Sequence, residues 1–345
     1  SDRHHQIYYK PEHLLKYSGK MIVSIDIVST GIAKASAKQI VSNEILCEII
    51  SARLYSKLHS SEPLGYSWNL TTSSKNDLRI GIIVGGFSAR IDLLITLILN
   101  ELLLYKRNRF ASVIDDALYF KSRSKIKEFY ENLAKQNSFQ LATAGSVVLL
   151  EENSIQLERR LEELSDNTYE DIEELVHQIF HNENNSLYTN IFVQGDVGKE
   201  QAFRISSQVD ILTNHLFRGH IPKEELNYKC PNTHFIKQGH NYYFERSSPD
   251  FTNSIVYFIQ TGLRDDSKNR TLTKLLSFFV SLDAITELRS NKQLGYVVTA
   301  GLRIYRNTTG IHISIVSGNY EPEALENEIN KYLMSLEHKL RDMTQ

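Results

Sequence analysis

The feature that most limits how this chain can fold is a tripeptide that occurs twice, 230 residues apart. Leu64-Gly65-Tyr66 and Leu294-Gly295-Tyr296 each follow a long helical pattern and precede two strands joined by a polar turn. The strands before the two helices also end alike, at Thr30-Gly31 and Thr261-Gly262. This shared order of elements indicates two homologous domains, because so long a period excludes a stacked solenoid repeat.

The hydrophobic pattern predicts an α+β fold, in which each domain is a mostly antiparallel sheet covered by helices on one side. Strands are expected at 20–31, 64–74, 77–86, 187–195, 240–248, 253–262, 294–305 and 310–318, with a turn at Lys75-Asn76-Asp77. Helices are expected at 33–59, 88–107, 110–136, 139–150, 154–165, 169–181, 198–216, 268–292 and from 321 onward.

A change in amino-acid composition marks the expected domain boundary. Residues 218–239 are mostly polar, contain two prolines and two glycines, and are expected to link a first domain, 1–217, to a second, 240–345. The first domain continues past its last matched helix through more helices and the 187–195 strand, whereas the second has no such continuation before Gln345. The second domain is therefore expected to be incomplete, with an open sheet edge and uncovered apolar surface.

Composition narrows the class of protein. A hydrophobic fraction of 41% and a charged fraction of 23% are typical of a globular chain. A net charge of −2 with no basic run argues against nucleic acid as a partner. Asp92, Asn100 and Glu101 interrupt the longest apolar stretch, so no membrane span is expected. Two isolated cysteines and no apolar leader at the start favour a reducing, cytoplasmic location.

The histidines give little support for a metal site. His177 and His181 are four residues apart on a predicted helix, the spacing of HExxH zinc sites, but Gln178 and Phe180 stand where such motifs need glutamate. An exposed helix end is the favoured interpretation, and His4, His5 and His13 lie in no periodic pattern. The sequence also has no phosphate-binding loop and no GxSxG motif. It therefore predicts no metal ligand and no complete catalytic site in this chain.

The stretch from Leu288 to Val298 contains the candidate functional residues. Arg289 lies at the end of an apolar helix and Tyr296 begins the next strand, directly after a glycine, so both side chains can face one cleft. The structural alternative is that Arg289 favours a helix C-terminus and that Tyr296 packs in a half-buried strand. The first copy keeps Tyr66 but has no arginine in this place, which argues for a functional role in the second copy.

The motif Arg289-x-x-x-Gln293-Leu294-Gly295-Tyr296 resembles that of the pitrilysin/insulysin family of zinc metallopeptidases, the inverzincins. The whole chain is similar to the C-terminal half of an insulin-degrading-type enzyme: its third domain, the joining segment and about half of its fourth. The Asn-, Lys-, Ile- and Ser-rich composition suggests a fungal, pheromone-processing member.

The resemblance implies a function for this half. In that family two halves close around a peptide, and the N-terminal half binds zinc through HxxEH and a distant glutamate. Arg289 and Tyr296 are then expected to hold the substrate and stabilise the transition state, and Ile285 to line the adjoining pocket. The expected partners are the N-terminal half and a peptide, with a possible homodimer, and the chain alone is expected to be inactive.

Two alternatives stay open. One is a non-catalytic subunit that holds peptides, such as a processing-complex core protein. The other is a scaffold without a peptide chamber, which burial of Arg289 against Tyr296 would favour.

Overall fold

The computed structural model describes residues 5–12, 18–29, 35–72, 78–107, 113–152, 154–181, 187–214 and 233–342. The chain contains both helices and strands, and its sheets are mostly antiparallel, as in an α+β fold. Contacts divide the chain into two compact units: unit 1, Ser1–Tyr130 with Ile155–Tyr228, and unit 2, Glu131–Ser154 with Lys229–Gln345.

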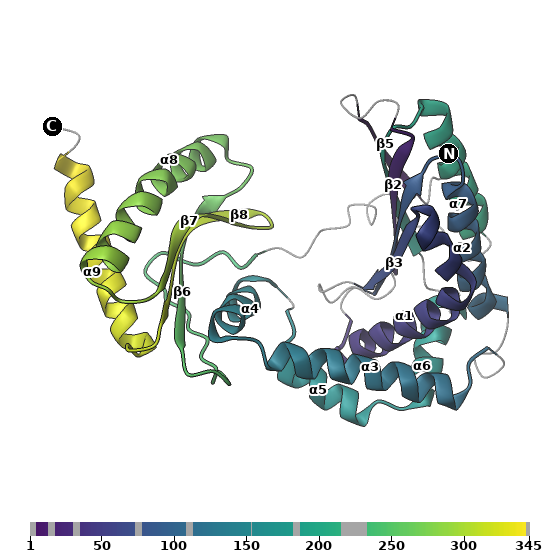
Figure 1. The fold of residues 1–345 in the computed structure, drawn as a ribbon, viewed down its shortest axis with the longest axis horizontal. Coiled ribbons are helices and arrows are strands. Elements are labelled where there is room, and N and C mark those ends of the chain that lie inside the picture. The colour runs from purple at the N-terminus through teal and green to yellow at the C-terminus, as the bar shows by residue number, and fades with distance from the viewer. Residues whose placement is uncertain are drawn as a thin grey trace. The chain divides into compact units, whose positions relative to one another are not determined.

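Unit 1 is built on a five-stranded sheet in the order β1-β5-β2-β4-β3. Its strands are β1 His5–Pro11, β2 Lys20–Ser29, β3 Ser67–Thr72, β4 Arg79–Phe87 and β5 Leu187–Gly195. All neighbouring pairs are antiparallel except β1 with β5. The helices gather on one side of this sheet (Figure 1). They are α1 Ala37–Leu58, α2 Ile91–Arg107, α3 Asp116–Ala134, α5 Leu157–Asp166, α6 Tyr169–Val176 and α7 Lys199–Asn214, with the short helical turns η1 His59–Leu64 and η3 His177–His181.

Unit 2 repeats the central part of this plan. Its sheet has the order β6-β8-β7, formed by β6 Asn253–Leu263, β7 Val297–Tyr305 and β8 Thr308–Ser317, all antiparallel. The helices α8 Ser267–Ala284 and α9 Pro322–Asp342 pack on one face through a cluster that includes Val280, Ile313 and Ile329. Because β2-β4-β3 and β6-β8-β7 have the same order and connections, the topology agrees with the duplication predicted from the sequence.

The segment that begins unit 2 precedes the expected linker. Helix α4 Ser138–Leu150 packs on β6. Ser138 Oγ is 2.7 Å from Ser254 Oγ on β6. Ser146 Oγ is 2.8 Å from Tyr305 Oη on β7, and it also donates to the Thr143 carbonyl within the same helix, at 2.7 Å. Ser254 and Tyr305 alternate with the residues that face α8 and α9, so α4 lies on the opposite face of the sheet. The expected domains, with boundaries at 217 and 240, are each continuous in sequence. The contacts instead assign Glu131–Ser154, which lies within the expected first domain, to unit 2.

Three local predictions need correction or completion. Residues 240–248 form no strand, although Tyr242 and Tyr243 suggested one: no neighbouring strand supplies a ladder, and both side chains are exposed. The strand β1 was not predicted, because its pairing partner β5 lies far along the chain. The ends of two predicted helices, at 177–181 and 285–291, are π-helical turns.

Some predictions fall outside the described residues: the turn at Lys75-Asn76-Asp77, residues 218–232 of the expected linker, Cys230, His4 and His13. Within the described part of the chain, no helix is both long and apolar enough to cross a bilayer.

Candidate functional site

The candidate site lies where the long helix of unit 2 ends and β7 begins. Asp266 caps α8 by accepting hydrogen bonds from the backbone N–H groups of Lys268 and Asn269. After Ala284 the helix widens into η4 Ile285–Asn291, a π-helical turn. Such turns shift the direction of side chains along a helix face and are frequent at functional sites.

The chain then turns sharply into the strand. The backbone N–H of Lys292 donates to the Glu287 carbonyl, and that of Leu294 donates to the Leu288 carbonyl; each N···O distance is 3.0 Å. Gln293 has a φ of 54°, in the left-handed region that permits this reversal. Leu288 and Leu294 are buried and fix the turn to the core of unit 2.

Gly295 is required by a close approach between backbones. A Cβ atom at this position would lie 2.2 Å from the Val316 carbonyl oxygen on β8. The next residue, Tyr296, donates its backbone N–H to that same oxygen over 3.1 Å. The glycine therefore lets the strand start against β8, and this position of the backbone directs the Tyr296 side chain outward.

The three predicted site residues all have exposed side chains. Tyr296 is 57% exposed, Ile285 is 38% exposed, and Arg289 is exposed one turn after Ile285. Among the described residues, no hydrogen bond, ion pair or ring contact involves the side chain of Arg289 or Tyr296. The fold thus brings them to one helix–strand junction without pairing them, and the burial that would favour a scaffold is not observed.

Ion pairs fix the junction to α9. Lys292 Nζ lies 2.7 Å from Glu328 Oε2, and Lys331 contacts the other oxygen of the same carboxylate. Hydrogen bonds from these two lysines lower the pKa of Glu328. This support was not visible in the sequence, because Lys292 and Glu328 are 36 residues apart.

The equivalent tyrosine of the first copy has a packing role. Gly65 ends η1 with a φ of 84°, and the Tyr66 ring packs edge-on against Phe87, with 6.2 Å between centroids. The residue 230 positions after Phe87 is Ser317, which is not aromatic. Tyr296 consequently has no such packing partner, which removes one structural explanation for it.

The histidine pair of unit 1 is not placed as a metal site. The rings of His177 and His181 lie 5.8 Å apart on η3, and His181 Nε2 is 2.8 Å from the Tyr105 carbonyl oxygen, which it can contact only as a donor. The part of the chain that the structure describes has no group of three or more His, Cys, Asp or Glu side chains arranged to hold a metal. These residues therefore do not fit a zinc ion.

Two parts of the chain match known protein families. Residues 1–163 match the family described as the middle or third domain of peptidase M16. Residues 275–345, which include the second half of α8, η4 and β7, match the family described as PQQ synthase PqqF-like, C-terminal lobe domain 4.

Three relatives were compared by sequence. The chain is 31% identical, over 92% of its length, to the putative protease AXL1 of Saccharomyces cerevisiae. It is 23% identical over 76% of its length to the insulin-degrading enzyme of Drosophila melanogaster, and 23% identical over 78% to the A-factor-processing enzyme of S. cerevisiae. The chain spans only 26%, 26% and 25% of these relatives, respectively.

The fold matches a solved structure over nearly the whole chain. The crystal structure of pitrilysin superposes with a TM-score of 0.79, covering 99% of this chain and 34% of that one. At 16% identity, this likeness concerns the fold alone.

Proposed function

The chain belongs to the pitrilysin/insulysin type of M16 peptidases, and we propose that it forms the zinc-free C-terminal half of a metalloendopeptidase. The observation that carries the proposal is the exposed, unpaired state of Arg289 and Tyr296 at one junction, within the described residues. A stable fold does not need an exposed arginine and an exposed tyrosine without partners, whereas substrate binding needs side chains that are free to contact the substrate.

Each residue has a defined chemical role in this proposal. Hydrolysis of a peptide bond places negative charge on the former carbonyl oxygen, and the Tyr296 hydroxyl donates a hydrogen bond to it. One such donor contributes about 2.7–4 kcal/mol to transition-state stabilisation. Arg289 donates to substrate backbone carbonyls, contacts worth about 1.5–3 kcal/mol each because one partner is charged. Ile285, one turn earlier, provides apolar contact to a substrate side chain.

Zinc enters only through another part of the protein. Because the described residues do not fit a metal, we assign the zinc to the N-terminal half, which is the expected partner of this chain. Zinc supplies Lewis-acid chemistry there. The residues of this chain bind and orient the peptide.

The expected substrate is a peptide, and the likeness to the A-factor-processing enzyme favours a pheromone precursor. A cytoplasmic location and a possible homodimer accompany the proposal as expectations from the sequence.

The test replaces Tyr296 by phenylalanine in the full-length protein. Tyr296→Phe should lower kcat about 10²-fold with little change in KM, because the lost hydrogen bond forms mainly in the transition state. The control is Tyr66→Phe, which removes the same hydroxyl at the equivalent position of the first copy and should leave kcat unchanged.

If Tyr296→Phe had the turnover of the wild-type protein, the Tyr296 hydroxyl would have no catalytic role and the side chain would contribute only to packing. A full-length protein that binds peptides without cleaving them, under any metal condition, would favour a non-catalytic binding subunit instead.

A further inference from the structure

The turn that joins η4 to β7 holds one residue in an unfavourable conformation between two anchors. Gln293 has a φ of 54°, in the left-handed region that a residue with a long side chain rarely adopts. Such a conformation persists only where the surrounding structure fixes it. On one side Leu294 is buried in the core of unit 2, and on the other Lys292 pairs with Glu328 of α9 at 2.7 Å. The path of the chain through the candidate site therefore depends on both anchors.

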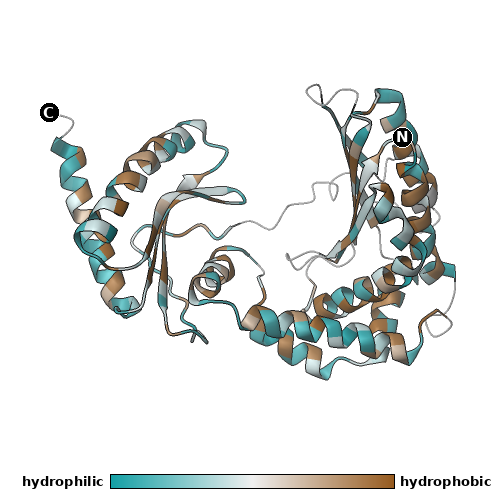
Figure 2. Cartoon of the chain, viewed as in Figure 1, coloured by the Kyte–Doolittle hydropathy of each residue, from teal (hydrophilic) through white to brown (hydrophobic). Residues whose placement is uncertain are grey.

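Glu328 lies at the border between the buried and the exposed side of α9. Figure 2 shows both hydrophobic and hydrophilic residues along this helix. The neighbouring Ile329 is buried, whereas the Glu328 side chain is 23% exposed. Its two oxygens contact Lys292 and Lys331. One carboxylate thus joins the turn to a helix whose own position is fixed by its buried side chains.

Both copies have an ion pair that joins their two long helices. In unit 1, Arg53 and Lys57 of α1 contact Glu101 of α2, each at 2.5 Å. The residue 230 positions after Arg53 is Asp283. Asp283 likewise joins α8 to α9, by pairing with Lys339 at 2.9 Å. This helix-to-helix link is therefore common to the two copies and has no special relation to Arg289 and Tyr296.

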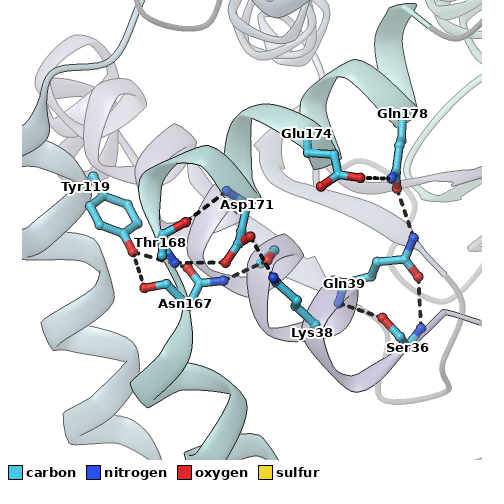
Figure 3. A network of polar contacts seen from close by, with 10 residues as sticks. Ser36, Lys38, Gln39, Tyr119, Asn167, Thr168, Asp171, Glu174 and Gln178 are labelled. Carbon is cyan, nitrogen blue, oxygen red and sulfur yellow. Dashed lines mark hydrogen bonds and ion pairs between the residues drawn. The ribbon is translucent and has the colours of Figure 1, made fainter.

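The link from a helix to the turn occurs only in the second copy, within the described part of the chain. The counterpart of Lys292, 230 positions earlier, is Glu62, which is exposed and has no side-chain partner among the described residues. Further polar contacts in unit 1, such as the pair of Lys38 with Asp171 in Figure 3, hold the beginning of α1 and not the turn that follows its end.

The two turns also differ in backbone conformation. Pro63 stands at the place of Gln293, and its ring fixes φ at about −65°. The first copy instead turns at Gly65, with a φ of 84°. The copy that has Arg289 is thus the one whose turn takes the strained conformation and has an ion pair to hold it.

We propose that Lys292 and Glu328 are positioning residues, which act through the turn to hold Arg289 and Tyr296 at the spacing that the peptide requires. This inference rests on the function proposed above. The reaction is sensitive to such spacing, because a displacement of about 1 Å can lower the rate about 10²-fold. Neither Lys292 nor Glu328 contacts the substrate, and each acts through the residues that do.

The test reverses each charge of this pair, and then both, in the full-length protein. Lys292→Glu and Glu328→Lys each replace attraction by repulsion and should lower kcat about tenfold. KM should change little, because the hydrogen bond from Tyr296 forms mainly in the transition state. The double variant restores an ion pair of opposite polarity and should regain at least about half of the wild-type kcat.

The matched control is Lys339→Glu, which reverses a charge in the helix-to-helix link. Its kcat should equal that of the wild-type protein, because this pair does not hold the turn. Amide hydrogen exchange supplies a second measurement that does not depend on activity. The backbone N–H of Leu294 donates across the turn to the Leu288 carbonyl, so it should exchange at least about fivefold faster in the two single variants but not in the double variant or the control.

Wild-type kcat in both single variants would overturn the inference. A double variant no more active than the single variants would also overturn it, since separate damage at the two positions would then explain the loss. So would an equal loss in Lys339→Glu, which would mean that any link between these helices suffices. A lower kcat without faster exchange at Leu294 would contradict an action through the turn.

Failure of the inference can be told apart from failure of the proposed function. Slow turnover by Tyr296→Phe, with wild-type turnover by the charge variants, would overturn the inference alone. Wild-type turnover by Tyr296→Phe would overturn the proposed function, and the positioning role would fail with it.

Discussion

The two tyrosines of the duplicated motif show how residues diverge on a shared backbone. Tyr66 packs against Phe87, whereas Tyr296, which directly precedes the equivalent strand, is 57% exposed. The leucine and the tyrosine of the motif have different surroundings in the two copies, since Leu64 is exposed and Leu294 is buried. Single-residue substitutions in this motif should therefore separate folding from function.

Gly295 belongs to the folding part of the motif. In Gly295→Ala the new Cβ would meet the Val316 carbonyl oxygen at 2.2 Å, and the backbone of β8 cannot move away without breaking its ladder. We expect a loss of about 1–3 kcal/mol in the free energy of unfolding of unit 2, measured by urea denaturation. Gly318→Ala is the control, because nothing lies within 4 Å of a Cβ there. Equal stability of the two variants would contradict this account of the glycine.

Glu101 gives unit 1 a pH-dependent contribution to stability. Its side chain is fully buried, and Arg53 and Lys57 each contact it at 2.5 Å. Burial alone would raise the pKa of Glu101, but hydrogen bonds from Lys57 and Arg53 outweigh it and lower the pKa. Since the folded state holds the proton less tightly than the unfolded state, this stability is present above the unfolded pKa of about 4.3 and is lost as the pH falls through the folded value.

Glu101→Gln should reveal that contribution. We expect the variant to be less stable than wild type by about 2 kcal/mol at pH 7, because charged hydrogen bonds are lost. The difference should shrink as the pH is lowered below about 4, as followed by circular dichroism in urea. Glu62→Gln, at an exposed side chain, is the control and should change little at either pH. A difference that did not vary with pH would mean that Glu101 contributes through packing.

At the scale of elements, α4 is the helix whose place differs most from its position in the sequence. Its side chains bond to both β6 and β7 of unit 2, although the helix precedes α5 to α7 of unit 1. Its sequence, SFQLATAGSVVLL, is apolar all round and indicates burial without indicating the partner. Gly145 fits the Phe244 ring, where a Cβ would lie 2.4 Å from the nearest ring atom.

The Ser146–Tyr305 hydrogen bond tests that placement. Both side chains are buried, and their oxygens lie 2.8 Å apart. A double-mutant cycle with Ser146→Ala and Tyr305→Phe should give a coupling energy of about 0.5–1.5 kcal/mol in the free energy of unfolding. Ser146→Ala combined with Tyr119→Phe, which lies in unit 1, should be additive. Additivity of the first pair as well would argue against α4 on this sheet.

At the scale of the whole molecule, the protein is two copies of one plan that differ in what covers them. Unit 1 has α5, α6, β5 and α7 around its sheet and first helices, and unit 2 has α4 on the other face of its sheet. The proposed peptidase half depends on an N-terminal half for the zinc.

This dependence predicts that the 345-residue chain is inactive by itself. Incubated with a fluorogenic peptide and added zinc, it should give no hydrolysis above background, because the described residues hold no group of three metal ligands. The full-length protein under the same conditions is the positive control. Hydrolysis by the 345-residue chain that a chelator abolishes would show that the metal is bound here and that our assignment is wrong.

The sequence by itself determined the duplication, the order of most helices and strands, the family and the candidate residues. These follow from short-range patterns: apolar periodicity, glycines at turns, and a motif within eight residues. The tertiary structure decided the partners of each face. The sequence did not indicate that β1 pairs with β5, that α4 joins unit 2, or that residues 240–248 form no strand. Each of these depends on segments distant in the chain, because periodicity shows that a surface must be buried and only packing determines what buries it.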